Sequence, residues 1–304
     1  MKKNRRITTF FFSLLIALLM FILVIFTSCS GNKANIKVYS VSTGGNSTTL
    51  NIDAEEEPDI PIREYEDQTV SKEVHSILFG MELNGLYSHT FEGWKGIRDH
   101  YKVPTENSEE VVVFEIDRNT GKICFFLHSY FRNYVWPEEK IVNKMTEQEC
   151  LPIAEHYLKE FTDMAAFYSL EKDNVIDRKN KAPNIYSFGY VLEKNGIECD
   201  YISIDIRSDG ELNSIDQDNV LNKQYYELAG NLDSDKLFKL SEETLKNKLE
   251  GKYNDYSIEC IGAYFAYYYD KMNFARVCYD IYTDKTDLYP ARFEVVVPLQ
   301  LCKK

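Results

Sequence analysis

The order of apolar and polar residues changes its period along this chain, and each period predicts a different kind of element. Between residues 69 and 143 short apolar runs predict strands at 76–81, 111–116 and 123–127. The last two runs are joined by residues 117–121 (DRNTG), in which aspartate favours the start of a turn and glycine supplies a positive φ. This part of the chain is therefore predicted to be rich in strands, with one clear hairpin.

From residue 146 the period becomes that of a helix. Thr146 and Glu149 fit a capping box, which marks the start of a helix. Apolar residues then recur on one helical face, at Leu151, Ala154, Leu158 and Phe161. Pro152 stands inside this pattern and is expected to kink the helix or to delay its start. A meander of three strands is predicted to follow, at 186–193, 197–206 and 211–215, with turns at 194–196 and 207–210.

The same order, a helix and then three strands, is predicted again near the C-terminus. A short helix capped by Ser241 is expected to end at Gly251, where glycine can adopt a left-handed conformation. Strands are predicted to follow at 257–269, 276–282 and 291–299. The recurrence suggests that the chain descends from a repeated unit.

The first thirty residues have the pattern of an export signal. A basic head at 2–6 precedes an apolar run at 10–26 that only Ser13 interrupts. Because basic residues keep their own end in the cytoplasm, the remaining chain is expected outside the cell membrane. Residues 26–29 (FTSC) resemble the lipobox of bacterial lipoproteins, and that resemblance implies that Cys29 carries the lipid. An uncleaved membrane anchor and a free secreted form remain alternatives, because the apolar run is nearly long enough to span a bilayer.

These elements predict an α+β fold in which antiparallel β-meanders carry packed helices behind an N-terminal signal or anchor. The segment after the apolar run is rich in Ser, Thr, Gly, Asn and Glu and lacks a sustained apolar period, which is typical of a flexible spacer. Five parts are predicted: a signal peptide or membrane anchor at 1–28, a flexible stalk at 29–68, a β-rich subdomain at 69–143, a helix-and-meander subdomain at 144–218 and a C-terminal α+β subdomain at 219–304.

Composition narrows the classes of partner. The chain has 48 acidic and 35 basic residues and a formal net charge of −13, which disfavours binding to nucleic acid. Besides Cys29 the sequence has cysteines at 124, 150, 199, 260, 278 and 302, and no two of them form a C-x-x-C pair. That spacing argues against a zinc ribbon and a thioredoxin-like centre. Buried free thiols and at least one disulfide both remain open.

The stretch 146–215 resembles a PepSY-type domain. The resemblance rests on the helix start T-E-x-E at 146–149, on I-A-E-x-x-L at 153–158 and on the ending ISIDIRSDGEL at 202–212. Residues 239–299 resemble a second, diverged copy. PepSY-type domains occur in propeptides of thermolysin-like metalloproteases and in exported bacterial proteins, so the resemblance implies a binding or regulatory module. The family has no catalytic residues to assign to this chain.

Few residue patterns point to chemistry. His156 and Glu160 lie four residues apart on the predicted helix and could contact one metal ion, but we expect a solvated pair because no further ligand can be placed. Ser169 and Lys172 match the S-x-x-K motif of penicillin-binding enzymes, yet the companion motifs are absent. We therefore expect no catalytic residue, no metal site and no cofactor.

Aromatic residues are the remaining candidates for binding. The densest group is 264–269 (YFAYYY), in which Tyr264 and Tyr268 share one face of a predicted strand. These two residues are the predicted partner contacts. We expect a tethered extracytoplasmic protein that is not an enzyme and that binds or regulates another envelope protein, a peptidase being one candidate. A solute-binding lipoprotein and a hydrolase of unrecognised type are the alternatives.

Overall fold

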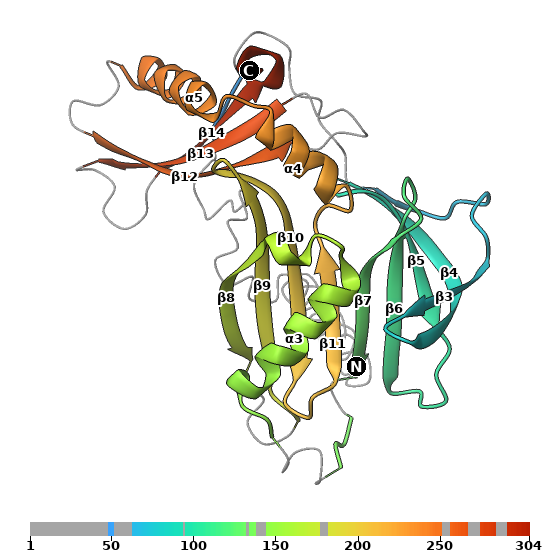
Figure 1. Cartoon of the computed structure of the whole chain (residues 1–304). Helices are drawn as coiled ribbons and strands as arrows, with labels where there is room; N and C mark the ends of the chain where they lie inside the picture. The colour runs from blue at the N-terminus through green and yellow to red at the C-terminus, as the bar shows by residue number, and fades with distance from the viewer. Residues whose placement is uncertain are drawn as a thin grey trace, which may run out of the picture. The chain divides into compact units, whose positions relative to one another are not determined.

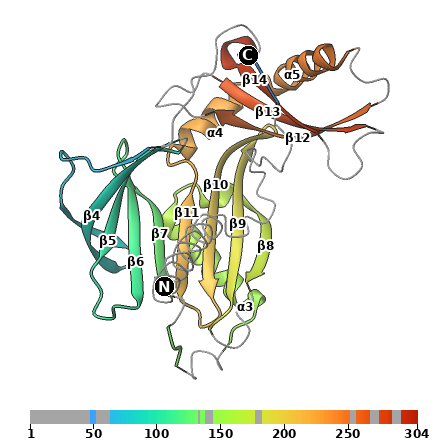
Figure 2. The same cartoon turned by 180° about the vertical axis from the view of Figure 1, so that it is seen from behind.

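A computed structural model describes residues 48–51, 63–93, 95–131, 134–137, 144–176, 182–250, 256–266, 274–283 and 291–304. The chain divides into two compact units, 1–38 and 39–304, and all described residues belong to the second. The predicted signal or anchor, Cys29 and Tyr268 lie outside the described residues. Figures 1 and 2 show the arrangement of the described elements from opposite sides.

An antiparallel meander forms the N-terminal part of the described chain. Its strands are β3 (Glu73–Leu78), β4 (Met81–Gly93), β5 (Gly96–Val103), β6 (Glu110–Asp117) and β7 (Ile123–Tyr130). The predicted hairpin is confirmed, with Gly121 at φ 69° and its N–H donating to the carbonyl oxygen of Asp117 at 2.8 Å. The strand predicted at 76–81 is wrong, because Phe79 and Gly80 adopt positive φ and turn the chain from β3 into β4.

The central part has a helix and an antiparallel meander. Its elements are α3 (Glu147–Phe161), the 3₁₀ turn Ala165–Phe167, β8 (Tyr168–Ile176), β9 (Ile185–Lys194), β10 (Ile197–Arg207) and β11 (Leu212–Gln217). The capping box of Thr146 and Glu149 is confirmed. The helix begins at Glu147 and runs through Pro152, so Pro152 does not delay its start. The prediction missed β8, which makes this a meander of four strands.

The C-terminal part has two helices before its strands. Its elements are α4 (Asn222–Gly230), α5 (Ser234–Leu249), β12 (Tyr256–Ala266), β13 (Phe274–Thr283), β14 (Ala291–Pro298) and the 3₁₀ turn Leu299–Cys302. The sequence did not predict α4. The expected cap at Ser241 is wrong, because Asp233 caps α5 by accepting from the backbone N–H of Lys236 at 3.0 Å. Ser241 instead lies buried inside the helix and bonds the hydroxyl of Tyr279.

Two short strands lie within the range predicted to be a stalk. β1 (Thr48–Asn51) pairs in parallel with β14, and β2 (Arg63–Tyr65) pairs with β4. These residues therefore belong to the sheet. The described chain is thus of mixed α and β structure, mostly strands in one large and predominantly antiparallel sheet, with three α-helices among the described residues.

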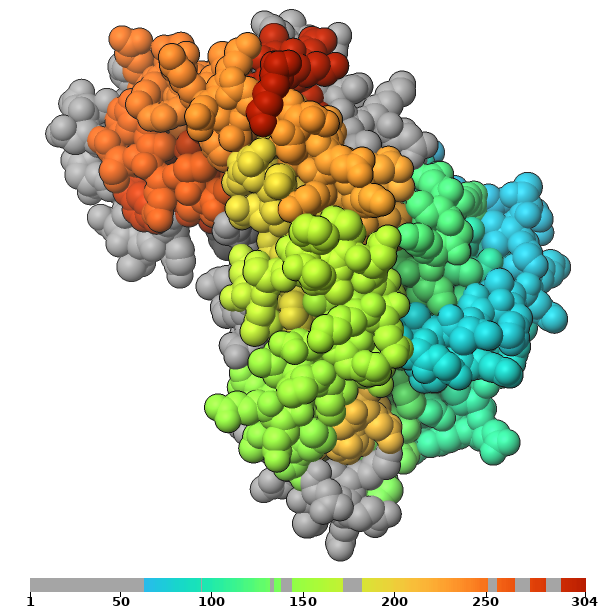
Figure 3. Space-filling model, in the orientation of Figure 1, coloured from blue at the N-terminus to red at the C-terminus, as the bar shows by residue number. Residues whose placement is uncertain are grey.

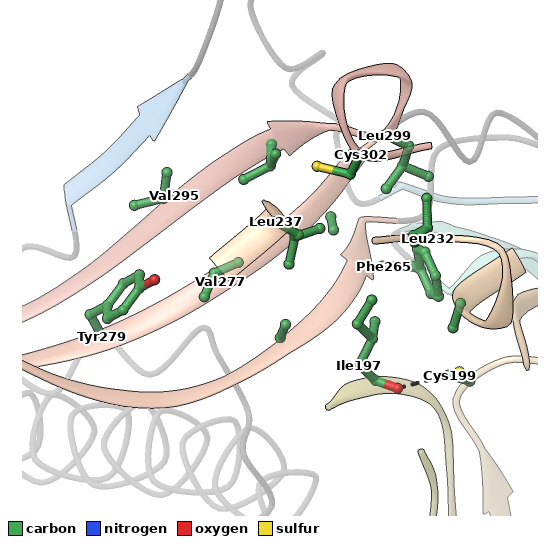
Figure 4. Close-up of a cluster of buried hydrophobic side chains, with 14 of the residues drawn as sticks. Ile197, Cys199, Leu232, Leu237, Phe265, Val277, Tyr279, Val295, Leu299 and Cys302 are labelled. Atoms are coloured by element: carbon green, nitrogen blue, oxygen red, sulfur yellow. Dashed lines mark hydrogen bonds between the residues drawn. The ribbon is translucent and has the colours of Figure 1, made fainter. Parts of the chain in front are cut away.

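The central and C-terminal parts join through a parallel contact, in which Ile197 and Glu198 of β10 pair with Ala263 and Tyr264 of β12. Two apolar cores lie on the sheet. One packs α3 against the central strands and the N-terminal meander, and the other packs α4 and α5 against β12–β14. Figure 4 shows the second core, where Leu237 of α5 lies near Val277 and Cys302.

Five of the six described cysteines are buried free thiols, at positions 124, 150, 199, 278 and 302. Cys260 is exposed. Burial raises the pKa of Cys124 and of Cys199 to about 12, so both side chains act as small protonated apolar groups. Between the two alternatives left open by the sequence, the structure has buried free thiols.

Gly85 in β4 lies against aromatic side chains of the first core. A Cβ atom there would approach the ring of Phe114 to 2.6 Å and the Cβ of Tyr101 to 2.8 Å, and both neighbours are buried. We expect Gly85→Ala to lower the free energy of unfolding by about 2 kcal/mol, because a packed core cannot yield without strain. Gly230→Ala at the end of α4 is the control, since its Cβ would meet only Lys194 Cε, at 3.9 Å. Urea unfolding of both variants measures the difference, and equal midpoints would contradict the expected strain.

Candidate binding pocket beside a buried carboxyl group

A pocket of about 320 Å³ opens where four separate segments of the chain meet. This volume lies near the lower end of the range for small-molecule sites. Its walls come from β3, from the turn between β6 and β7, from the end of α3 and from the connection between β11 and α4. In Figure 3 the yellow-green surface of α3 adjoins the blue surface of the N-terminal strands and the orange surface of α4. The lining residues are Ser76, Ile77, Leu78, Gly121, Lys122, Ile123, Glu160, Phe161, Thr162, Gln217, Val220 and Asn222.

Hydrogen bonds fix the polar residues of the pocket. Gln217 Nε2 donates to Asp200 Oδ2 at 2.6 Å and to the carbonyl oxygen of Asn219 at 3.0 Å. Asn222 Nδ2 donates to Thr162 Oγ1 at 3.1 Å and to the hydroxyl oxygen of Tyr168 at 3.0 Å. Gln217, Asn222 and Thr162 are all buried, so these bonds hold the ends of α3 and β11 and the start of α4 together.

The network ends on the carboxyl group of Asp200, which lies on β10 and is 3 % exposed. Besides Gln217, the hydroxyl of Tyr168 donates to Oδ2 at 2.5 Å. The backbone N–H groups of Tyr201 and Asn219 each donate to Oδ1 at 2.8 Å. Burial raises the pKa of Asp200 to about 7, although the hydrogen bonds act in the opposite direction. A carboxyl group that titrates near neutrality beside a pocket is the kind of group found at functional sites.

Sequence reasoning did not single out Asp200, Gln217 or Asn222. Strand β10 also contains Glu198 and Asp205, so no signal in its sequence set Asp200 apart. Its donors come from four different segments, so only the folded chain brings them together.

A second polar group, on another part of the sheet, pairs two histidines. The rings of His89 and His100 stack with centroids 4.5 Å apart, and His100 Nδ1 lies 3.2 Å from Glu115 Oε1. Burial and then the neighbouring His100 lower the pKa of His89. Sequence reasoning did not single out His89 or His100. Among the described residues, no group of three or more His, Cys, Asp or Glu side chains could hold a metal ion.

A third group surrounds Arg207 at the end of β10. Its guanidinium carbon lies 5.5 Å from the ring centroid of Tyr130 and 5.3 Å from that of Trp136. Its Nε donates to Asp209 Oδ1 at 3.3 Å, and its Nη2 bonds Glu211. Because the guanidinium group of Arg207 already lies over the rings of Tyr130 and Trp136, we interpret this aromatic cage as structural.

The candidate site residues from the sequence lie on different elements of the structure and do not form one site. Tyr264 lies half-buried on β12, where Arg276 Nη1 donates to its hydroxyl at 3.4 Å and burial raises its pKa. His156 Nε2 and Glu160 Oε1 form an exposed pair at 3.1 Å, as expected for a solvated pair. Ser169 lies on strand β8, so the helical spacing that S-x-x-K chemistry needs is not present.

A comparison with known protein families, curated proteins and solved structures finds no match for this chain. In the part of the chain that the structure describes, no helix combines the length and the apolar character that a membrane crossing requires.

Proposed function

We propose that the chain is an extracytoplasmic protein, tethered to the cell membrane through Cys29 or an uncleaved anchor, that binds or regulates another envelope protein without catalysing a reaction. The export pattern of the first thirty residues supports the location. The order of a helix and a meander in 144–218, and of two helices and a meander in 219–304, is compatible with two PepSY-like copies. A peptidase is the partner class that this resemblance suggests.

The proposal of a protein partner rests on one observation. Strand β8 has an edge that no described strand covers. Among the described strands only β9 pairs with β8, and the pairing covers one side of the strand. Figure 1 shows β8 at the margin of the central strands. An edge strand presents backbone N–H and C=O groups to which an extended segment of another polypeptide can pair.

Exposed apolar side chains near β8 favour contact of this edge with another polypeptide over contact with water. Phe167 is 54 % exposed and Leu170 is 43 % exposed, and Phe167 contacts Tyr226 with ring centroids 5.3 Å apart. The register of β8 shifts between Leu170 and Lys172. This bulge divides the edge, so the partner is expected to add a short strand.

Charged residues placed at this edge are expected to reduce capture of the partner. We predict that Phe167→Lys combined with Leu170→Lys lowers recovery of the partner about tenfold, because both apolar contacts are lost and a charge must be desolvated. The measurement is chemical cross-linking of the full chain in intact cells, followed by affinity purification and mass spectrometry.

Val135→Lys is the matched control, because Val135 is 84 % exposed and precedes Trp136, whose ring lies on Arg207. In the strand register Arg207 pairs through Ile185 with the far end of β8 from Leu170. A partner that wild type and this control recover equally, and the double variant loses, supports strand addition at β8. Equal recovery by all three proteins would remove β8 as the contact.

A further inference from the structure

The side-chain amide of Gln217 leaves its oxygen atom, and no hydrogen, available to a ligand. Both hydrogens of Gln217 Nε2 are used, one by Asp200 and one by the carbonyl oxygen of Asn219. No described residue donates to Gln217 Oε1. Both hydrogens of Asn222 Nδ2 are also used, by Thr162 and Tyr168, and its Oδ1 already accepts from the backbone N–H of Lys223 at 2.7 Å. The side-chain amide of Gln217 therefore offers an acceptor to the pocket.

The end of α3 adds negative potential to one wall of the pocket. Glu160, Phe161 and Thr162 line the pocket, and they are the last turn and the C-cap of this helix. Carbonyl groups in the last turn of a helix carry a partial negative charge, and Glu160 adds a full one. The carboxyl group of Asp200, which ionises near pH 7, lies directly behind Gln217.

The remaining wall is largely apolar. Ile77 and Leu78 of β3, Ile123, Phe161 and Val220 all line the pocket. Ile77 is 64 % exposed, so this side of the pocket presents apolar surface to solvent. Burial of a small apolar body against these side chains would contribute roughly 25 cal/mol for each Å² removed from water.

We propose that this pocket binds a primary ammonium group carried on a small apolar body. The ammonium group donates hydrogen bonds to Gln217 Oε1 and to the terminal carbonyl groups of α3, and Glu160 attracts its charge. The apolar body packs against Ile77 and Val220. An ammonium ion has three donors and no acceptor, which matches a wall of acceptors. Phe167 and Leu170, the proposed partner contacts, do not line this pocket, so ligand binding goes beyond the proposed partner binding.

Lys122 provides a test of the sign of the ligand's charge. It is the one lining residue with a positive side chain, and it is exposed on the turn between β6 and β7. If the ligand is a cation, Lys122 repels it and Glu160 attracts it. Substitutions at these two positions must then act in opposite directions, whereas an anion would reverse both signs.

The test is calorimetric titration of the chain from residue 30 to 304 with n-hexylammonium at pH 7.5 and low ionic strength. We expect one saturable site with a dissociation constant on the order of 1 mM or tighter. Glu160→Gln is expected to weaken binding about two- to fivefold, and Lys122→Met to tighten it about two- to fivefold. Hexanoate and 1-hexanol are expected to bind at least about tenfold more weakly, because neither carries the cation.

Glu155→Gln is the matched control, because Glu155 is an exposed carboxylate on the same helix that does not line the pocket. It is expected to leave the dissociation constant unchanged. The pocket assignment is overturned if hexanoate binds as tightly as hexylammonium, if no saturable binding occurs, or if the control changes binding as much as Glu160→Gln does. The double variant of Phe167 and Leu170 should retain full ammonium binding, so failure at β8 and failure at the pocket are distinguishable.

Discussion

The unfolding free energy of Asp200→Asn, measured relative to wild type, is expected to rise by about 4 kcal/mol in total between pH 4 and pH 7. The pKa of the Asp200 carboxyl group is raised from 3.8 to about 7. In the unfolded chain the group loses its proton near pH 3.8, whereas in the folded chain it keeps the proton until about pH 7. Its favourable contribution is therefore complete below pH 3.8 and is lost as the pH rises to 7.

Asparagine keeps one of the two acceptor atoms of Asp200. Its side-chain oxygen can take the place of Oδ1, which accepts from the backbone N–H groups of Tyr201 and Asn219. Its NH2 group replaces Oδ2, the acceptor of Gln217 Nε2, and this loss lowers the stability by an amount that does not depend on pH. The neutral amide does not ionise, so the cost of burying a charge disappears. Asp200→Leu, in contrast, leaves these N–H groups and Gln217 without an acceptor and is expected to destabilise the fold at every pH by about 3 kcal/mol or more.

Urea unfolding at a series of pH values from 4 to 8 measures the difference between wild type and variant. The exposed Asp163→Asn substitution controls for the change in net charge. Unfolding free energies of wild type and Asp200→Asn that stay parallel across this range would show that the carboxyl group does not titrate near neutrality.

Arg207→Met is expected to lower the free energy of unfolding by about 3–5 kcal/mol, the range for removing one member of a buried ion pair. Arg207 is 2 % exposed, and its partner Asp209 has a side chain that is 8 % exposed. Loss of the guanidinium group leaves the Asp209 carboxylate without this buried cation. It also removes the cation from the faces of Tyr130 and Trp136.

Tryptophan fluorescence reports this change directly. The chain has two tryptophans, so a Trp94→Phe background isolates the emission of buried Trp136. We expect Arg207→Met to shift this emission to the red in the native state and to lower the unfolding midpoint. Arg63→Met on the exposed strand β2 is the control and should change stability by about 0.5 kcal/mol at most. A wild-type midpoint in Arg207→Met would show that the cage is stable without its arginine.

Elements with a complete local signal were predicted with the right type and place. The capping box at Thr146 fixed the start of α3 despite Pro152. Asn195 and Gly196 both adopt positive φ, at 56° and 76°, as the turn between β9 and β10 requires. In these cases the side chain or backbone preference acts within a few residues of the chain, so distant packing does not change the outcome.

Elements that depend on distant neighbours were missed. Phe79 takes a positive φ of 52°, which is unfavourable for an aromatic residue, and its ring packs on Tyr157 of α3 at a centroid distance of 4.7 Å. That tertiary contact offsets the strain and turns an apolar run into the end of one strand and the start of another. Strand β8 likewise depends on its pairing with β9, which no local pattern in 168–176 reveals.

The sequence by itself determined the α+β class, the hairpins, the main helix and the pattern of an export segment, because these follow from residue preferences and periods over short distances. Only the tertiary structure decided the pocket and the state of Asp200. The donors to that carboxyl group stand on β8, β10, β11 and the segment before α4, and burial by all of them raises its pKa. Desolvation is a property of the closed fold, and no stretch of sequence carries it alone.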